Sequence, residues 1–159
     1  MDVVFNRVGK RFGQRDALAD LSFELQSGEM AFLTGHSGAG KSTLLRLLLL
    51  LERASSGDIA VGGRPLSKIK PSGIAKYRRD FGVVFQDHQL LSDRSVYHNV
   101  ALPLEIAGFT QRDIDRRVRA ALDKVGLLDR ERANPDTLSG GEQQRVAIAR
   151  ALCMQPQLM

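Results

Sequence analysis

The sequence predicts an α/β fold with a mostly parallel core sheet, a small antiparallel β part and an inserted helical part. Three observations predict it. Residues 30–33 and 81–85 are short, nearly all-apolar runs, which are typical of parallel strands covered on both faces. A glycine-rich segment, 35–42, joins the first run to an apolar helical stretch. Beyond residue 95, apolar residues recur at helical spacing.

The antiparallel part is expected from three short strand patterns. Residues 3–5, 21–25 and 58–61 carry β-favouring residues, and Gly62-Gly63 follows the third pattern as a turn. These segments predict a small sheet beside the parallel core.

Two helices are expected after Ser95. The first spans 95–107, with Pro103 as a potential kink, and the second starts at Thr110, an N-cap residue, and ends near Gly126. In the second helix the apolar residues share one face, which predicts an amphipathic helix packed on a core; they are Ile114, Val118, Leu122 and Val125.

Length and composition indicate one globular domain. The chain has 159 residues, of which 43% are hydrophobic, enough to form a core. We expect no secretory leader at the N-terminus and no transmembrane segment, because no apolar run approaches the ~20 residues that span a bilayer. The single cysteine, Cys153, indicates a reducing compartment and is expected to pack inside a helix.

The net charge of +5 raises the question of nucleic-acid binding. Basic residues concentrate in 64–79 and 112–132, but acidic residues are interleaved in the second cluster and neither cluster has aromatic residues placed to stack on bases. We therefore expect no nucleic-acid partner; a mild attraction to an anionic membrane surface is favoured instead.

The segment 35–42 fits the phosphate-loop pattern G-x-x-x-x-G-K-[ST]. Its residues are Gly35, His36, Ser37, Gly38, Ala39, Gly40, Lys41 and Ser42, with Thr43 following. Glycines let the loop wrap its amides around phosphates, Lys41 supplies a point charge, and the Ser42 hydroxyl can ligate Mg²⁺. This motif predicts the phosphate chain of a nucleotide and Mg²⁺ as ligands, and alone it leaves kinases, GTPases and many ATPases open. For His36 alone, a solvent-facing loop position stays open.

A second motif spans 138–145 and reads Leu-Ser-Gly-Gly-Glu-Gln-Gln-Arg. Ser139 and Glu142 have the spacing of a capping box, so one interpretation is simply a well-capped helix. Capping leaves Gly140 and Gly141 unexplained, since each glycine in a first helical turn costs about 1 kcal/mol relative to alanine. Bare amides at a helix N-terminus favour an anion, so phosphate binding is the competing interpretation.

Together the two motifs resemble those of the ATP-binding cassette family, where they are the Walker A and the signature. The resemblance implies a homodimer in which the signature of one subunit, here Ser139, Gly140, Gly141, Glu142 and Gln143, faces the ATP bound by the Walker A of the other. It also implies that Phe12, otherwise readable as a core residue, stacks on adenine, and that Gln86 contacts Mg²⁺ and water in the Q-loop. Family-based boundaries are 1–86 for the β part with Walker A, 87–153 for the helical subdomain, and 154–159 for the start of the Walker B strand.

Within this family the chain is most similar to the bacterial cell-division branch, through 35–42, 85–91 and 93–104. That resemblance implies a peripheral subunit at the cytoplasmic face of the inner membrane, working with an integral membrane protein and coupling ATP turnover to cell-wall hydrolysis at the septum. The ATPases of lipoprotein-releasing and macrolide-export systems are the alternative. A DNA-repair ATPase would carry a coiled coil between the two motifs, and 41–139 has no such heptads.

The sequence departs from the family pattern after residue 155. The family pattern continues with a strand ending in Asp-Glu and, later, a histidine near the γ-phosphate; no residue here can be assigned to these roles. The carboxylates and imidazoles that do not fit these roles are Asp87, Asp93, Asp136, His36, His88 and His98. We therefore expect an incomplete cassette with no assignable catalytic residue, little hydrolysis by this chain alone, exposed apolar edges at 30–33 and 81–85, and low stability. A nucleotide-binding module without turnover stays open as a further alternative.

Overall fold

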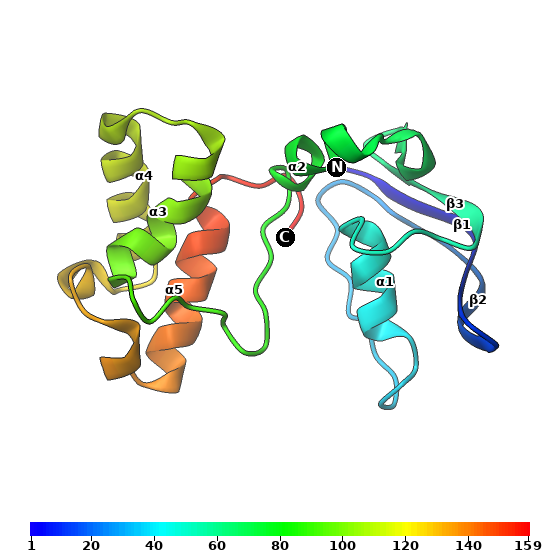
Figure 1. The fold of residues 1–159 in the computed structure, drawn as a ribbon, viewed down its shortest axis with the longest axis horizontal. Helices are drawn as coiled ribbons and strands as arrows, with labels where there is room; N and C mark the ends of the chain where they lie inside the picture. Colours follow the sequence, from blue (N-terminus) through cyan, green and yellow to red (C-terminus); the bar gives the residue numbers. More distant parts are fainter. The chain divides into compact units, whose positions relative to one another are not determined.

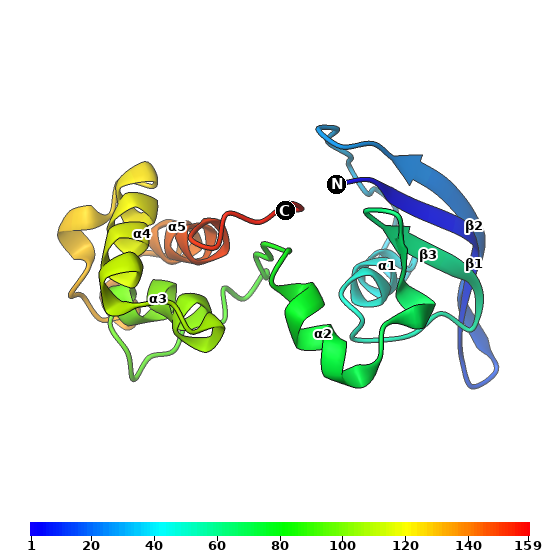
Figure 2. The same ribbon diagram turned by 90° about the horizontal axis from the view of Figure 1, so that it is seen from above.

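Four strands of the computed structural model, which describes residues 1–159, form one antiparallel sheet (Figures 1 and 2). The strands are β1 (Val3–Phe12), β2 (Arg15–Leu25), β3 (Ser56–Val61) and β4 (Arg64–Pro65), in the order β2-β1-β3-β4. The predicted strand segments 3–5, 21–25 and 58–61 are confirmed, and the predicted turn Gly62-Gly63 joins β3 to β4 with φ angles of 56° and 72°. Positive φ at both turn residues is the type I′ geometry that suits the twist of a hairpin.

Strand β1 contains a bulge that changes which side chains face the core. Val3 and Phe5 are buried and alternate as expected, but the next buried apolar side chain is Val8, three residues on. The extra residue is accommodated at Arg7, whose φ is 47°. Gly57 of β3 lies against this bulge, since a Cβ at Gly57 would stand 2.2 Å from the carbonyl oxygen of Arg7.

Helix α1 (Lys41–Leu48) follows the glycine loop and lies on one face of the sheet (Figures 1 and 2). Its Leu44 and Leu47 are buried. A 3-10 turn (Leu66–Lys68) then leads to α2 (Pro71–Arg78), which is tied to the end of α1 because the Tyr77 hydroxyl donates to the Leu48 carbonyl at 2.6 Å. These elements complete a first compact unit, Met1–Arg78.

The second unit, Arg79–Met159, is helical. Helices α3 (Val96–Ala107), α4 (Gln111–Lys124) and α5 (Gly140–Leu152) pack around one core, with short 3-10 turns at Leu128–Arg130 and Pro135–Thr137. The core side chains come from all three helices and the segments between them: Val96, Val100, Ala101, Leu104, Ile114, Val118, Ala121, Leu122, Leu127, Leu138, Val146, Ala149 and Cys153. The predicted apolar face of α4 is confirmed, with Val125 partly buried at its end.

The predicted helix boundaries in this unit are confirmed by their caps. The side chains of Ser95, Thr110 and Ser139 each accept a hydrogen bond from the backbone N–H three residues on. Gly126 follows α4 with φ 69°, the left-handed conformation that commonly ends a helix. Pro103 lies within α3.

The two segments expected as parallel strands differ from the prediction. Residues 30–33 form no strand, and of 81–85 only Phe81 pairs, in a parallel bridge with Leu158. A strand requires a partner for its backbone groups, and apart from that bridge neither segment has one in this chain. The apolar side chains of 30–33 are accordingly exposed, as expected: Phe32 is 80% and Met30 78% accessible. In 81–85 only Phe85 is exposed, whereas Phe81, Val83 and Val84 are partly buried, so the expected exposed edge is only partly present there. The fold's paired strands are therefore its antiparallel ones.

The two compact units divide after Arg78. The reason lies in the start of the 81–85 segment. Besides the bridge of Phe81, the Gly82 amide donates to the Leu158 carbonyl at 2.8 Å, which joins this segment to the C-terminal residues. None of the helices combines the length and the apolar character needed to cross a membrane.

The contact between Gly57 and the β1 bulge gives a first prediction. Gly57→Ala should lower the free energy of unfolding by about 2–5 kcal/mol, combining about 1–2 kcal/mol for a left-handed alanine with about 1–3 kcal/mol for displacing backbone. Urea unfolding followed by circular dichroism measures it. Gly63→Ala is the matched control, because Gly63 also has positive φ, 72°, but open space around its Cβ position. Equal losses for the two variants would show that the bulge contact does not matter.

Candidate nucleotide-binding site

The glycine loop between residue 34 and α1 has a backbone that only glycine adopts easily. Gly35, Gly38 and Gly40 have φ angles of 143°, 82° and 89°. Side chains disfavour this conformation, so the three glycines fix the path of the loop. The intervening residues His36, Ser37 and Ala39 are exposed, which leaves the loop open to a ligand.

Gly40 also brings the loop into close contact with β2. A Cβ at Gly40 would lie 2.6 Å from the Ala17 carbonyl oxygen and 2.7 Å from Leu18 Cδ2. Real Cβ atoms do not approach backbone so closely. Glycine at position 40 is therefore required for packing against β2 as well as for the backbone conformation.

Lys41 bends back over the loop. Its Nζ donates to the Gly35 carbonyl at 2.5 Å and to the His36 carbonyl at 2.8 Å. The His36 ring contacts the neighbouring Ser37 carbonyl through Nδ1 at 2.8 Å and is otherwise exposed. The loop is thus held by the same ammonium group that is expected to meet phosphate.

The backbone donors of the loop fit an anion. Among the loop amides only that of Ala39 has a backbone acceptor, the His36 carbonyl at 3.2 Å, and the first amide bond entering α1 is from Leu44 to Gly40 at 2.9 Å. The amides of Gly38 and Gly40 therefore have no backbone partner, and the first turn of α1 adds further unsatisfied N–H groups. A phosphate chain would supply the missing acceptors.

Ser42 and Thr43 lie in the first turn of α1. Ser42 is exposed and Thr43 half-buried. A hydroxyl oxygen in this place is a suitable ligand for Mg²⁺, a hard cation that prefers oxygen. The donor set therefore fits the predicted metal, with Ser42 as its residue in the first unit.

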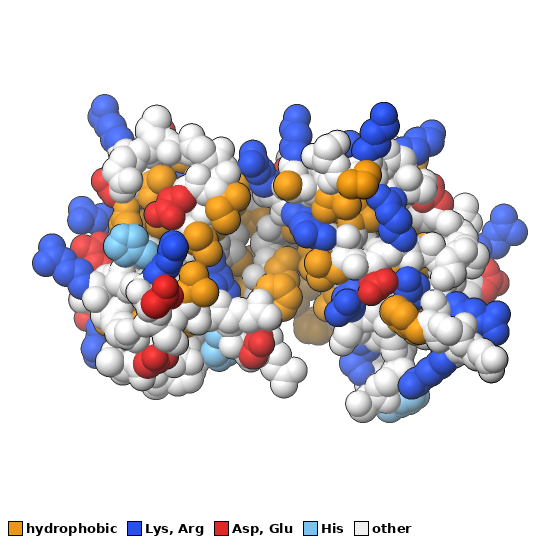
Figure 3. Space-filling model, in the orientation of Figure 1, with side chains coloured by type: hydrophobic (Ala, Val, Ile, Leu, Met, Phe, Trp, Pro, Cys, Tyr) orange, Lys and Arg blue, Asp and Glu red, His pale blue; other side chains and the backbone are white.

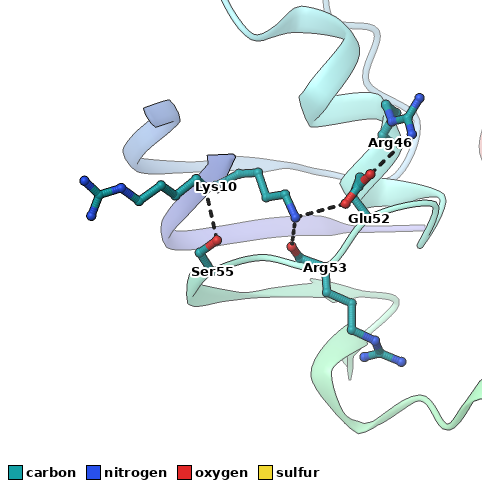
Figure 4. A network of polar contacts seen from close by, with 6 residues as sticks. Lys10, Arg46, Glu52, Arg53 and Ser55 are labelled. Carbon is teal, nitrogen blue, oxygen red and sulfur yellow. Dashed lines mark hydrogen bonds and ion pairs between the residues drawn. The ribbon is translucent and has the colours of Figure 1, made fainter. Parts of the chain in front are cut away.

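Phe12, the residue expected to stack on adenine, is 45% exposed at the end of β1. One face of its ring is covered by Lys10, whose Nζ lies 4.7 Å from the ring centroid. Lys10 is itself fixed, because Nζ also donates to Glu52 Oε2 and to the Arg53 carbonyl, both at 3.0 Å (Figure 4). The cation–π contact orients the ring and leaves exposed surface for a base.

Glu52 is the acidic centre of this network. It accepts from Lys10 at 3.0 Å and from Arg46 at 3.3 Å (Figure 4). The hydrogen bond from Lys10 and the positive charges of both partners hold the pKa of Glu52 below its ordinary value. Lys10 is not evident from the sequence, where its only signal is a basic residue two positions before Phe12.

Gln86 belongs to the second unit, in an exposed turn with Asp87. The segment that follows is held by Arg150 of α5, which donates to the His88 carbonyl at 2.6 Å and the Gln89 carbonyl at 2.7 Å. Both residues have positive φ, 56° and 46°, so two charge-assisted bonds stabilise an unusual backbone. Sequence reasoning missed Arg150 because nothing in a helix pattern marks a distant carbonyl partner.

Ser139 and Glu142 form the complete capping box at the start of α5. The Ser139 amide and hydroxyl both donate to Glu142 Oε2, at 2.9 and 2.7 Å, while the Glu142 amide donates to Ser139 Oγ at 3.3 Å. These hydrogen bonds from Ser139 lower the pKa of Glu142. The structure therefore confirms the capping box of Ser139 and Glu142.

The other residues of the second motif divide into two roles. Gln143 is turned into the protein, where its Nε2 donates to the Pro135 carbonyl at 3.0 Å. Gly140 and Gly141 have nothing within 4 Å of a Cβ position, and both are exposed. No contact inside this chain therefore requires glycine at these two positions.

Charge on the visible surface is mixed. On the face in Figure 3, Lys and Arg side chains are distributed over both units, and Asp and Glu side chains stand among them. No cluster of three or more His, Cys, Asp or Glu side chains that could hold a metal ion by itself is present.

A glycine loop with free amides, a lysine beside it and a serine on the following helix define a phosphate-loop nucleotide-binding protein. The phosphate-loop pattern at 35–42 and the second motif at 138–145 together narrow this class to one family. The chain belongs to the ABC transporter family, which matches residues 18–159.

Individual relatives agree with this assignment. The cell division ATP-binding protein FtsE of Escherichia coli K12 is 55% identical over 156 residues, covering 98% of this chain and 70% of FtsE. FtsE of Haemophilus influenzae is 46% identical over 159 residues, covering 99% of this chain and 73% of that protein. The dimeric, ADP- and Pi-bound structure of the ATP-binding cassette MJ0796 superposes with a TM-score of 0.85 at 31% identity, over 97% of this chain and 70% of that one. The overall fold class is confirmed by this structural similarity.

The capping box predicts a pH dependence. Because the folded pKa of Glu142 is lowered, its contribution to stability is present above the ordinary pKa of 4.5 and is lost as the pH falls through the folded value. The difference in unfolding free energy between wild type and Glu142→Gln, measured with urea, should therefore shrink between pH 6 and pH 3. A difference that stays constant over this range would mean that the carboxylate is not part of the cap in solution.

Proposed function

We propose that this chain is the ATP-binding subunit of a membrane-associated ABC-type complex that acts in bacterial cell division. The observation that carries the proposal is the combination of a phosphate loop with free amides and 55% identity to FtsE along 98% of the chain. Base, phosphate and metal are assigned to Phe12, the loop 35–41 and Ser42 respectively. Gln86 is proposed as a second residue at the metal.

ATP would bind in the first unit through groups of complementary chemistry. The open ring surface of Phe12 takes the adenine, and the unpaired amides of Gly38 and Gly40 take phosphate oxygens. Lys41, which now donates to two loop carbonyls, would exchange them for phosphate oxygens, a charge-assisted and therefore stronger interaction.

The signature would act on the nucleotide of a second copy of the chain. Two features support this assignment: the open space around Gly140 and Gly141, and the dimeric arrangement of the related cassette MJ0796. The N-terminus of α5 offers amides and a positive dipole end to a negatively charged phosphate. To donate to that phosphate, Ser139 would turn its hydroxyl away from Glu142.

Hydrolysis and the membrane partner follow from the same relationship. We propose ATP turnover for the assembled protein and a peripheral position at the cytoplasmic face of the inner membrane, beside an integral membrane protein of the FtsX type. Identity to FtsE favours this role over a lipoprotein-releasing or macrolide-type exporter.

Nucleotide binding is tested by calorimetric titration of the chain with Mg-ATP. Lys41→Ala should weaken ATP binding roughly tenfold or more, through loss of charge-assisted hydrogen bonds. Phe12→Ala should weaken it roughly 5- to 150-fold, because base stacking on an aromatic ring is worth about 1–3 kcal/mol. Unchanged affinity in Lys41→Ala, with the fold intact by circular dichroism, would refute the proposed phosphate site.

The composite site is tested separately with Ser139→Arg. This variant should bind Mg-ATP with wild-type affinity but lose ATP-dependent self-association in analytical ultracentrifugation, because the arginine side chain blocks the approach of the partner's phosphates. Arg145→Ser is the matched control on an exposed position of the same helix. If Ser139→Arg loses binding and association together, the signature is not acting on a second copy.

A further inference from the structure

Arg15 stands next to the phosphate loop but belongs to none of the motifs above. It is the first residue of β2, and in the sheet register it is the cross-strand partner of Phe12. Its Nη2 atom lies 3.6 Å from the position that a Cβ on Gly38 would occupy. The tip of the β1–β2 hairpin therefore brings a guanidinium group to the middle of the glycine loop.

This guanidinium has no acidic partner. The nearest carboxylate in sequence, Asp16, is paired with Arg11 at 3.5 Å. The side chain of Arg15 takes part in no ion pair or hydrogen bond, and the residue is exposed. Five N–H donors in a planar fork, which match phosphate oxygens well, are thus available.

A purely structural role does not account for Arg15. The loop carbonyls of Gly35 and His36 are already occupied by Lys41, and Arg15 donates to no carbonyl of the loop. Its guanidinium lies close to Gly38, whose amide is one of the loop donors without a backbone acceptor. A cation and an unpaired N–H group side by side form an anion-binding arrangement rather than a tether.

We propose that Arg15 is an additional phosphate-binding residue, which donates from its guanidinium to the phosphate chain of the nucleotide whose base stacks on Phe12. The proposal rests on the proposed ATP binding and extends it. The cross-strand pair Phe12 and Arg15 then contacts both ends of one ligand, the ring holding the base and the long arginine arm reaching the phosphates on the loop. The hairpin tip becomes part of the binding site rather than a support for one aromatic ring.

The test compares Arg15→Gln with Arg11→Gln by calorimetric titration with Mg-ATP, inorganic triphosphate and adenosine. Arg15→Gln should weaken ATP and triphosphate by a similar factor, roughly tenfold, and should leave adenosine binding unchanged. It should also reduce the salt dependence of ATP affinity, since one ionic contact is lost. Arg11→Gln, on the same hairpin but paired with Asp16, should stay within about twofold of wild type.

A third variant distinguishes lost contact from lost structure. Arg15→Lys keeps the charge, so it should recover part of the triphosphate affinity that Arg15→Gln loses, with thermal midpoints alike in all variants. Wild-type ATP and triphosphate affinity in Arg15→Gln would overturn the proposal, and so would an equal loss for adenosine, which would indicate a distorted hairpin. If the folded wild-type chain binds neither ATP nor triphosphate, the proposed function itself fails before any variant is compared.

Discussion

The close contact between Gly40 and strand β2 is the constraint on which the first unit depends. With 2.6 Å between the Ala17 carbonyl oxygen and the place of a Cβ, the loop reaches the sheet only because residue 40 has no side chain. The contact sets the start of α1, and hence the direction in which the unpaired loop amides point. It also sets the distance from the loop to the hairpin tip that carries Phe12 and Arg15.

The glycines of the phosphate loop and those of the motif at 138–145 have opposite surroundings. Gly40 is packed against backbone, so its role is complete within the chain. Gly140 and Gly141 are surrounded by open space, and their helix would be more stable with alanine by about 1 kcal/mol per residue. Because no contact within the chain requires glycine at these positions, we propose that they admit the close approach of a second copy.

Structural features that depend on neighbouring residues were predicted well from the sequence. Features that depend on partners distant in the chain were not. The caps at Thr110 and Ser139 and the Gly62-Gly63 turn need only neighbours within three residues, so the sequence determines them. Residues 30–33 have the composition of a buried strand but no pairing partner, and composition alone does not provide one. Lys10 and Arg15 were missed for the same reason, since their importance lies in groups brought close by β1 pairing with β2 and by the loop.

We propose that the amides of the glycine loop are held ready for the phosphates of ATP. Hydrogen–deuterium exchange followed by mass spectrometry measures this directly on the chain, with and without Mg-ATP. We predict that nucleotide slows amide exchange in residues 35–43 and at the hairpin tip, 12–15, more than anywhere else in the first unit. Exchange in 35–43 that is unchanged at saturating Mg-ATP, or slowing only outside the loop and hairpin tip, would contradict it.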